Sequence, residues 1–161
     1  MPRLNHERLP GPASIIRPAR RIRKADKVEL LGRLPLFENT SKKELGAISD
    51  AMVEAERPAG SLLTREGKDG GLMFVIVEGE AEVVSGDGTV IGRLGRGDVV
   101  GELSLIDGRA RSASVKALSD VRILQLASDD FYRLVQTSPR FVRNLLRALS
   151  QRVREAEQLT L

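Results

Sequence analysis

The sequence contains no cysteine, no tryptophan and a single histidine, and aromatic residues make up only 3% of its 161 residues. Without cysteine there is neither a disulfide framework nor a thiolate metal site, so nothing indicates a secreted scaffold. A single histidine, His6, argues against a histidine-rich catalytic metal centre. No apolar run approaches the ~18 to 20 residues that a membrane-spanning helix requires. We therefore expect a cytoplasmic, non-enzymatic protein without a metal or cofactor.

Positive charge is concentrated at the N-terminus. Residues 1–27 carry eight Lys or Arg and two acidic residues, whereas the rest of the chain carries 18 basic and 20 acidic residues. Four of the seven prolines also fall in the first 18 residues, and frequent proline with few apolar side chains disfavours a long helix. We predict a flexible basic arm over residues 1–25 and one folded domain over residues 26–161. The arm is either a solvated tail or a contact for an acidic partner, nucleic acid or an anionic membrane.

The folded part is predicted to begin with helices and to continue with strands. Apolar residues recur at helical spacing before Pro35 and again after a capping-box pattern formed by Ser41 and Glu44. After residue 60, short apolar runs alternate with glycine turns, which is typical of antiparallel strands. The runs are residues 62–63, 72–77, 81–84, 90–94, 99–100, 112–117 and 121–126. About eight short strands of this kind favour a jelly roll or a small barrel.

Helical spacing returns at the C-terminus. A short helix is expected over residues 129–135, and Ser138 followed by Pro139 is a typical start for a longer one. The apolar stripe of that longer helix comprises Val142, Leu145, Leu146, Leu149, Val153 and Ala156. The stripe can cover the sheet or meet a second copy, and the sequence leaves both open. The predicted fold class is mainly β with flanking helices, including a long C-terminal lid helix.

The segment from Val99 to Val115 carries the chemistry that distinguishes this chain. Gly101 allows close backbone approach, Glu102 can accept hydrogen bonds from hydroxyl groups, and Arg111 can hold a phosphate oxygen through its forked donors. This combination suits a sugar phosphate. The alternative for an isolated Glu–Arg pair is a surface salt bridge that contributes only ~0 to 1 kcal/mol.

The motif Gly101-Glu102-Leu103-Ser104, followed by Arg111-Ser112-Ala113, resembles the cyclic nucleotide-binding domain of catabolite activator proteins, cAMP-dependent kinase regulatory subunits and cyclic-nucleotide-gated channels. The resemblance extends over residues 34–155. It implies that the segment is a phosphate-binding cassette in which Arg111 neutralises the single phosphate charge and Glu102 binds the ribose 2′-hydroxyl. Backbone N–H groups after Gly101 and around Ser112 would supply further donors.

The resemblance also implies the remaining ligand contacts. Val83 and Ile91 would join the apolar wall behind the sugar, and the last helix would close over the base through Arg152 and Val153. The complete predicted ligand set is Val83, Gly101, Glu102, Leu103, Ser104, Arg111, Ser112, Ala113 and Arg152. The expected ligand is cAMP, with cGMP as the alternative, because Ser112 gives no positive signal for cGMP.

The implied function is a sensor that reports a cyclic nucleotide by moving its C-terminal helix. Two alternatives stay open: a ligand-free structural or dimerisation domain, and the regulatory part of a larger transcriptional or signalling assembly. No helix-turn-helix pattern follows the long helix, so we do not expect direct DNA binding. A homodimer through the C-terminal helix is a further expectation.

Overall fold

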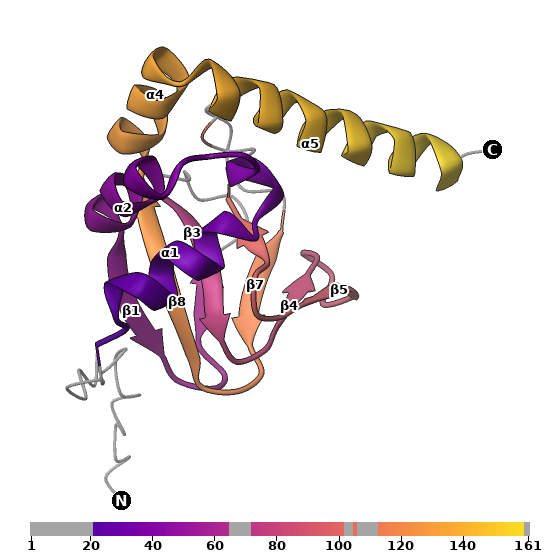
Figure 1. The fold of residues 1–161 in the computed structure, drawn as a ribbon. Coiled ribbons are helices and arrows are strands. Elements are labelled where there is room, and N and C mark those ends of the chain that lie inside the picture. The colour runs from indigo at the N-terminus through magenta and orange to yellow at the C-terminus, as the bar shows by residue number, and fades with distance from the viewer. Residues whose placement is uncertain (1–20, 65–71, 102–104, 106–112, 160–161) are drawn as a thin grey trace, which may run out of the picture.

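The computed structural model consists of two antiparallel sheets with helices packed against one face and one end (Figure 1). The structure describes residues 21–64, 72–101, 105 and 113–159. The first sheet has the strand order β1-β8-β3-β6, and the second has the order β2-β7-β4-β5. Two facing four-stranded sheets correspond to the jelly roll of the prediction rather than to a closed barrel.

The strands are short, as expected from the sequence. They are β1 (Val53–Arg57), β2 (Leu62–Thr64), β3 (Leu72–Glu78), β4 (Ala81–Val84), β5 (Val90–Leu94), β6 (Val99–Val100), β7 (Ser114–Ala117) and β8 (Val121–Ala127). The helical elements are α1 (Lys24–Gly32), the 3₁₀ turn η1 (Pro35–Phe37), α2 (Lys42–Ala51), α4 (Ser128–Thr137) and α5 (Pro139–Leu159). The mainly β fold with flanking helices and a long C-terminal helix is therefore confirmed.

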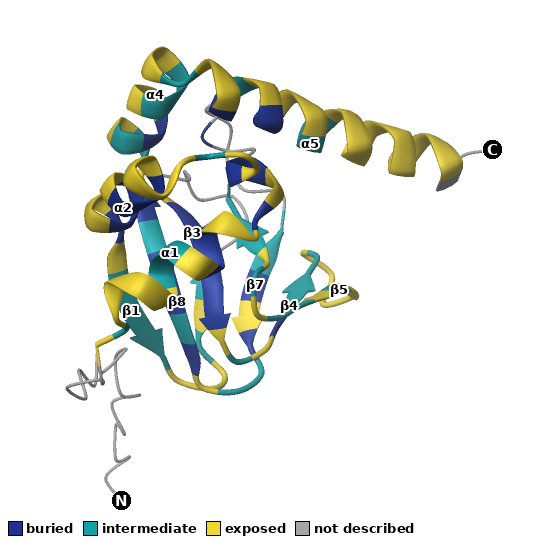
Figure 2. Cartoon of the chain, viewed as in Figure 1, coloured by how far each residue is buried: buried dark blue, intermediate teal, exposed yellow. Residues whose placement is uncertain are grey.

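Strand β3 forms the centre of the molecule because both of its faces are buried. Met73 and Val75 point into a cluster with the helices, and Phe74 and Ile76 point into a second cluster between the sheets. Side chains alternate along a strand, so five consecutive apolar residues supply both cores. Figure 2 shows the resulting dark-blue strand beneath the helices.

The helical cluster joins both ends of the chain. Leu31 from α1 and Phe37 from η1 pack in the same core as Phe131 from α4 and Phe141 from α5. The rings of Phe37 and Phe141 are stacked with centroids 5.7 Å apart, and Phe131 meets Phe141 edge-on at 5.5 Å. These aromatic contacts fix the first turns of α5 against the N-terminal helices.

Local hydrogen bonds explain several predicted boundaries. Ser41 Oγ accepts from the Glu44 N–H at 3.1 Å and caps α2, while Ser138 Oγ accepts from the Phe141 N–H at 3.2 Å at the start of α5. The segment Gly86-Asp87-Gly88, one of the glycine turns expected between strands, joins β4 to β5.

One strand was missing from the prediction. The segment Val53–Arg57 alternates charged with smaller residues, and the expected strands began only after residue 60. It pairs with β8 along its full length, and ion pairs reinforce it, because Glu54 lies 3.0 Å from Lys27 and Glu56 lies 3.0 Å from Arg122. Backbone pairing to a buried neighbour thus creates a strand that apolar patterning does not reveal.

Candidate functional site

The structure describes the borders of the predicted cassette but not its centre. The predicted ligand residues Glu102, Leu103, Ser104, Arg111 and Ser112 lie outside the described residues, as do positions 1–20 of the predicted arm. Gly101, Leu105 and Ala113 are described, and so are Val83 and Arg152. These described residues form the border of the predicted site.

The frame is an apolar cluster between the two sheets. Val83 in β4 pairs with Val115 in β7, and both pack with Phe74 of β3. Val100 pairs with Phe74 across β3 and β6 and packs against the same cluster. Gly101 follows directly with a φ of 96°, a left-handed conformation that favours glycine. The chain therefore enters residues 102–112 from a strand that packs against the same cluster as Val83.

The chain also leaves this segment at the same cluster. Ala113 is half-buried and comes immediately before β7, where Ser114 pairs with Val84 and Val115 pairs with Val83. Val100 and Val115, which flank the segment, thus pack in the same cluster as Val83, although 11 residues separate Gly101 from Ala113 in the sequence. The two sheets therefore connect both ends of the segment to the cluster that Val83 joins.

Leu105 connects this segment to the helices. Its side chain is 2% exposed and belongs to the cluster that contains Phe131, Phe141 and Leu145. Tyr132 Oη on α4 donates a hydrogen bond to the Leu105 carbonyl oxygen. Sequence reasoning missed this connection, because nothing in the spacing of Tyr132 indicates which backbone carbonyl its hydroxyl reaches.

The three remaining predicted contacts are exposed. Ile91 on β5 is 60% exposed and lies outside the apolar cluster that Val83 joins. Arg152 and Val153 lie on the exposed second half of α5, which extends beyond the sheets in Figure 2. The predicted roles of Ile91, Arg152 and Val153 toward a ligand stay predictions.

Asn144 is a buried polar residue that the sequence analysis did not single out. It is 5% exposed, and its Nδ2 donates to the carbonyl oxygens of Leu36 at 3.1 Å and Glu38 at 3.0 Å. These bonds hold α5 against η1 and satisfy two carbonyls that follow the end of the first helix.

Within the described ranges, no group of three or more His, Cys, Asp or Glu side chains is arranged to hold a metal ion. Among the helices that the structure describes, none has the length and apolar character needed to cross a bilayer.

The two facing antiparallel sheets, the helices packed against them and the long C-terminal helix α5 define a jelly-roll β domain. The family model described as "Cyclic nucleotide-binding domain" matches residues 54–138, which is just over half of the chain. The chain belongs to the cyclic nucleotide-binding domain family. The resemblance inferred from the cassette motif is thereby confirmed.

Known relatives come from several kinds of regulated protein. A cyclic nucleotide-gated potassium channel of Rhizobium etli is 36% identical over 124 residues, which cover 77% of this chain and 34% of the channel. The Thermus thermophilus catabolite activator protein is similar in structure, with a TM-score of 0.73, 28% identity, and coverage of 78% of this chain and 61% of that one. The regulatory domain of Toxoplasma gondii PKA, solved with cAMP, gives a TM-score of 0.64, 30% identity, and coverage of 68% and 43%. This chain thus spans about a third of the length of the channel relative.

Proposed function

We propose that this chain is a non-catalytic, cytoplasmic sensor domain that binds cAMP and signals through its C-terminal helix. The observation that carries the proposal is that Val100 and Val115, on the strands that flank residues 101–113, pack with Val83 in one apolar cluster, in a chain of the cyclic nucleotide-binding family. A site that joins an apolar wall to both ends of a Gly-Glu…Arg-Ser segment suits a ribose held between a hydrophobic surface and an anion-binding loop.

In this proposal the two charged side chains bind different parts of the ligand. Arg111 neutralises the single negative charge of the cyclic phosphate, and Glu102 accepts a hydrogen bond from the ribose 2′-hydroxyl. Gly101 leaves room for the sugar because its backbone adopts the left-handed region without a side chain. Val83 and Ala113 cover the apolar face of the sugar. The expected dissociation constant is micromolar, which corresponds to about 8 kcal/mol.

The proposed signal passes through Leu105. Leu105 shares its cluster with Phe141 and Leu145 of α5, and Tyr132 of α4 bonds to its carbonyl oxygen. A ligand that repositions the cassette therefore changes the packing under both helices, and α5 shifts only by as much as the ligand prefers one of its positions. Tyr132→Phe should weaken this coupling and reduce cAMP affinity by a few-fold, because one hydrogen bond of about 1 kcal/mol is lost.

A homodimer through α5 is a second candidate role, favoured by a specific observation. Leu146 and Val153 are 61% and 57% exposed, and their spacing of seven residues puts them on one side of the helix. Sedimentation velocity of the wild type and of a Leu146→Glu, Val153→Glu variant tests this role. A dimer that dissociates in the variant supports it, and a wild-type monomer at all concentrations contradicts it.

Calorimetric titration with cAMP and cGMP tests the binding proposal. We expect the wild type to bind cAMP and to prefer it over cGMP, and Arg111→Ala to lose binding. Arg96→Ala is the matched control, because Arg96 is an exposed arginine in the turn before β6. Equal affinity in wild type and Arg111→Ala contradicts the assigned phosphate site, and no binding to the wild type favours the ligand-free structural domain.

The absence of cysteine allows a clean distance measurement for α5. Spin labels at Lys116→Cys on β7 and Arg154→Cys on α5 would occupy two exposed positions. We expect cAMP to change the distribution of distances between the labels. An unchanged distribution at saturating cAMP contradicts signalling through α5 while leaving ligand binding intact. The division into an arm over residues 1–25 and a domain over residues 26–161, and an acidic partner for the arm, remain part of the proposal.

A further inference from the structure

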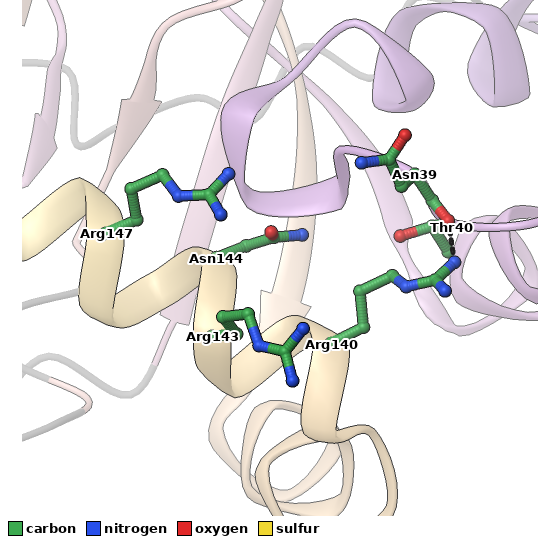
Figure 3. Close-up of a pocket in the computed structure, with 6 residues that line it drawn as sticks. All are labelled: Asn39, Thr40, Arg140, Arg143, Asn144 and Arg147. Atoms are coloured by element: carbon green, nitrogen blue, oxygen red, sulfur yellow. Dashed lines mark hydrogen bonds between the residues drawn. The ribbon is translucent and has the colours of Figure 1, made fainter.

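A polar pocket lies between the start of α5 and the loop that joins η1 to α2 (Figure 3). Its volume is ≈ 540 Å³, and a neighbouring cavity of ≈ 350 Å³ at the α4–α5 junction shares Arg140 and Arg143 with it. The pocket is lined by Asn39, Thr40, Arg140, Arg143, Asn144 and Arg147. We call the two cavities together the arginine trough.

Arg140, Arg143 and Arg147 project from α5, and in Figure 3 the guanidinium group of Arg140 reaches Asn39 and Thr40. Arg140 donates to the backbone carbonyl of Asn39, which is uncharged, so its positive charge is not neutralised there. Arg147 lies 3.2 Å from Glu38. Arg143 makes no hydrogen bond or ion pair with any residue that the structure describes. At least two positive charges of the trough are therefore available to an anionic group.

Further positive groups lie beside the arginine trough, and an acidic residue lies at each of its two ends. Lys42 and Lys43 begin α2 next to Thr40, and the N-terminus of α5 contributes its partial positive charge near Arg140. Glu38 and Glu44 lie at opposite ends of the trough. The chain after residue 27 has 18 basic and 20 acidic residues, so the trough is a positive region on a slightly negative domain.

We propose that the arginine trough docks an acidic peptide segment of a protein partner. The three arginines span seven residues of α5, or roughly 10 Å, which matches about three residues of an extended peptide. Guanidinium groups pair with carboxylates through two parallel hydrogen bonds. Each exposed pair is weak by itself, so a ligand with several carboxylates in succession gains more here than a small anion does.

Nucleic acid fits the trough less well. A phosphate backbone needs a continuous basic surface, whereas Glu38 and Glu44 interrupt this one and the domain as a whole is not basic. None of the residues that line the trough belongs to the predicted ligand set, so peptide docking can be tested in the absence of cAMP.

Fluorescence anisotropy with a labelled oligoglutamate peptide tests the proposal on the full chain. We expect the wild type to bind the peptide and Arg143→Glu to weaken binding about tenfold or more, because one charge-assisted bond is lost and a repulsive charge is added. Arg154→Glu is the matched control, since it makes the same charge change at an exposed site on the same helix. The control should bind within about twofold of the wild type.

Each outcome decides the proposal. Because Arg143 is exposed and unpaired among the described residues, Arg143→Glu should keep the wild-type circular dichroism and melting temperature. Equal weakening in Arg143→Glu and Arg154→Glu would show only a general charge effect and would overturn the proposal. The proposal is also overturned if the wild type does not bind the oligoglutamate peptide. Tighter binding of the wild type to a duplex oligonucleotide at the same salt concentration would overturn it as well.

Discussion

Replacing Asn144 with alanine should destabilise the protein by about 1.5 kcal/mol. The substitution removes two hydrogen bonds, to the carbonyls of Leu36 and Glu38, and each such bond is worth about 1 kcal/mol net. Alanine is a better helix former than asparagine, which offsets the loss in unfolding free energy by about 0.5 kcal/mol. For a chain of this length, the net loss corresponds to a melting temperature lower by roughly 3 to 6 °C.

Urea unfolding followed by circular dichroism measures this loss. Asn144→Asp keeps the size of the side chain but replaces the donor with a carboxylate beside two carbonyl oxygens, so it should cost at least as much as alanine. Arg154→Ala, at an exposed position of the same helix, should change stability by less than about 0.5 kcal/mol. If Asn144→Ala and Asn144→Asp both unfold like the wild type, the buried amide does not hold α5 against η1.

Two further predictions concern single turns. At Gly79, which has a φ of 97°, an added Cβ would lie 2.8 Å from Val121 Cγ1, so Gly79→Ala should lower the free energy of unfolding by about 2 kcal/mol or more. At Gly88, which has a φ of 85°, an added Cβ would meet open space, so Gly88→Ala should lower it by only about 1 kcal/mol. Thermal unfolding of the two variants measures the difference. Hydrogen bonds lower the pKa of Asp87 to about 2, and the largest effect is that of the Ser85 hydroxyl. The ionised carboxylate therefore stabilises the folded turn fully above pH 3.8, and this stabilisation is lost as the pH falls through 2. An NMR titration should find that pKa, and Ser85→Ala should raise it; an unchanged value in Ser85→Ala contradicts the assigned cause.

Much of the fold follows from local patterns in the sequence. The apolar run of β3, the serine caps of α2 and α5, and the glycine turn between β4 and β5 each depend on neighbouring residues and were predicted. Strand β1 was not, because its stability comes from pairing with β8, whose partner residues lie 64 to 72 positions further along the chain.

In the candidate site, too, local features could be predicted and long-range contacts could not. The motif around Gly101 identified the family, because residue types and spacing within one segment are visible in a sequence. The contact between Tyr132 and Leu105 and the position of Asn144 beneath η1 depend on how helices pack over long sequence separations. The row of arginines on α5 was visible in the sequence, but the opposing Asn39 and Thr40 that make it a pocket were not.

An amide NMR titration with cAMP tests the central claim most directly, because it reports both binding and its location. We predict the largest chemical-shift changes at Gly101, Leu105, Ala113 and Val83, with smaller changes in the first turns of α5. Saturating cAMP that leaves these amides unmoved, or that shifts only those around the arginine trough, would contradict a cyclic nucleotide site between the two sheets.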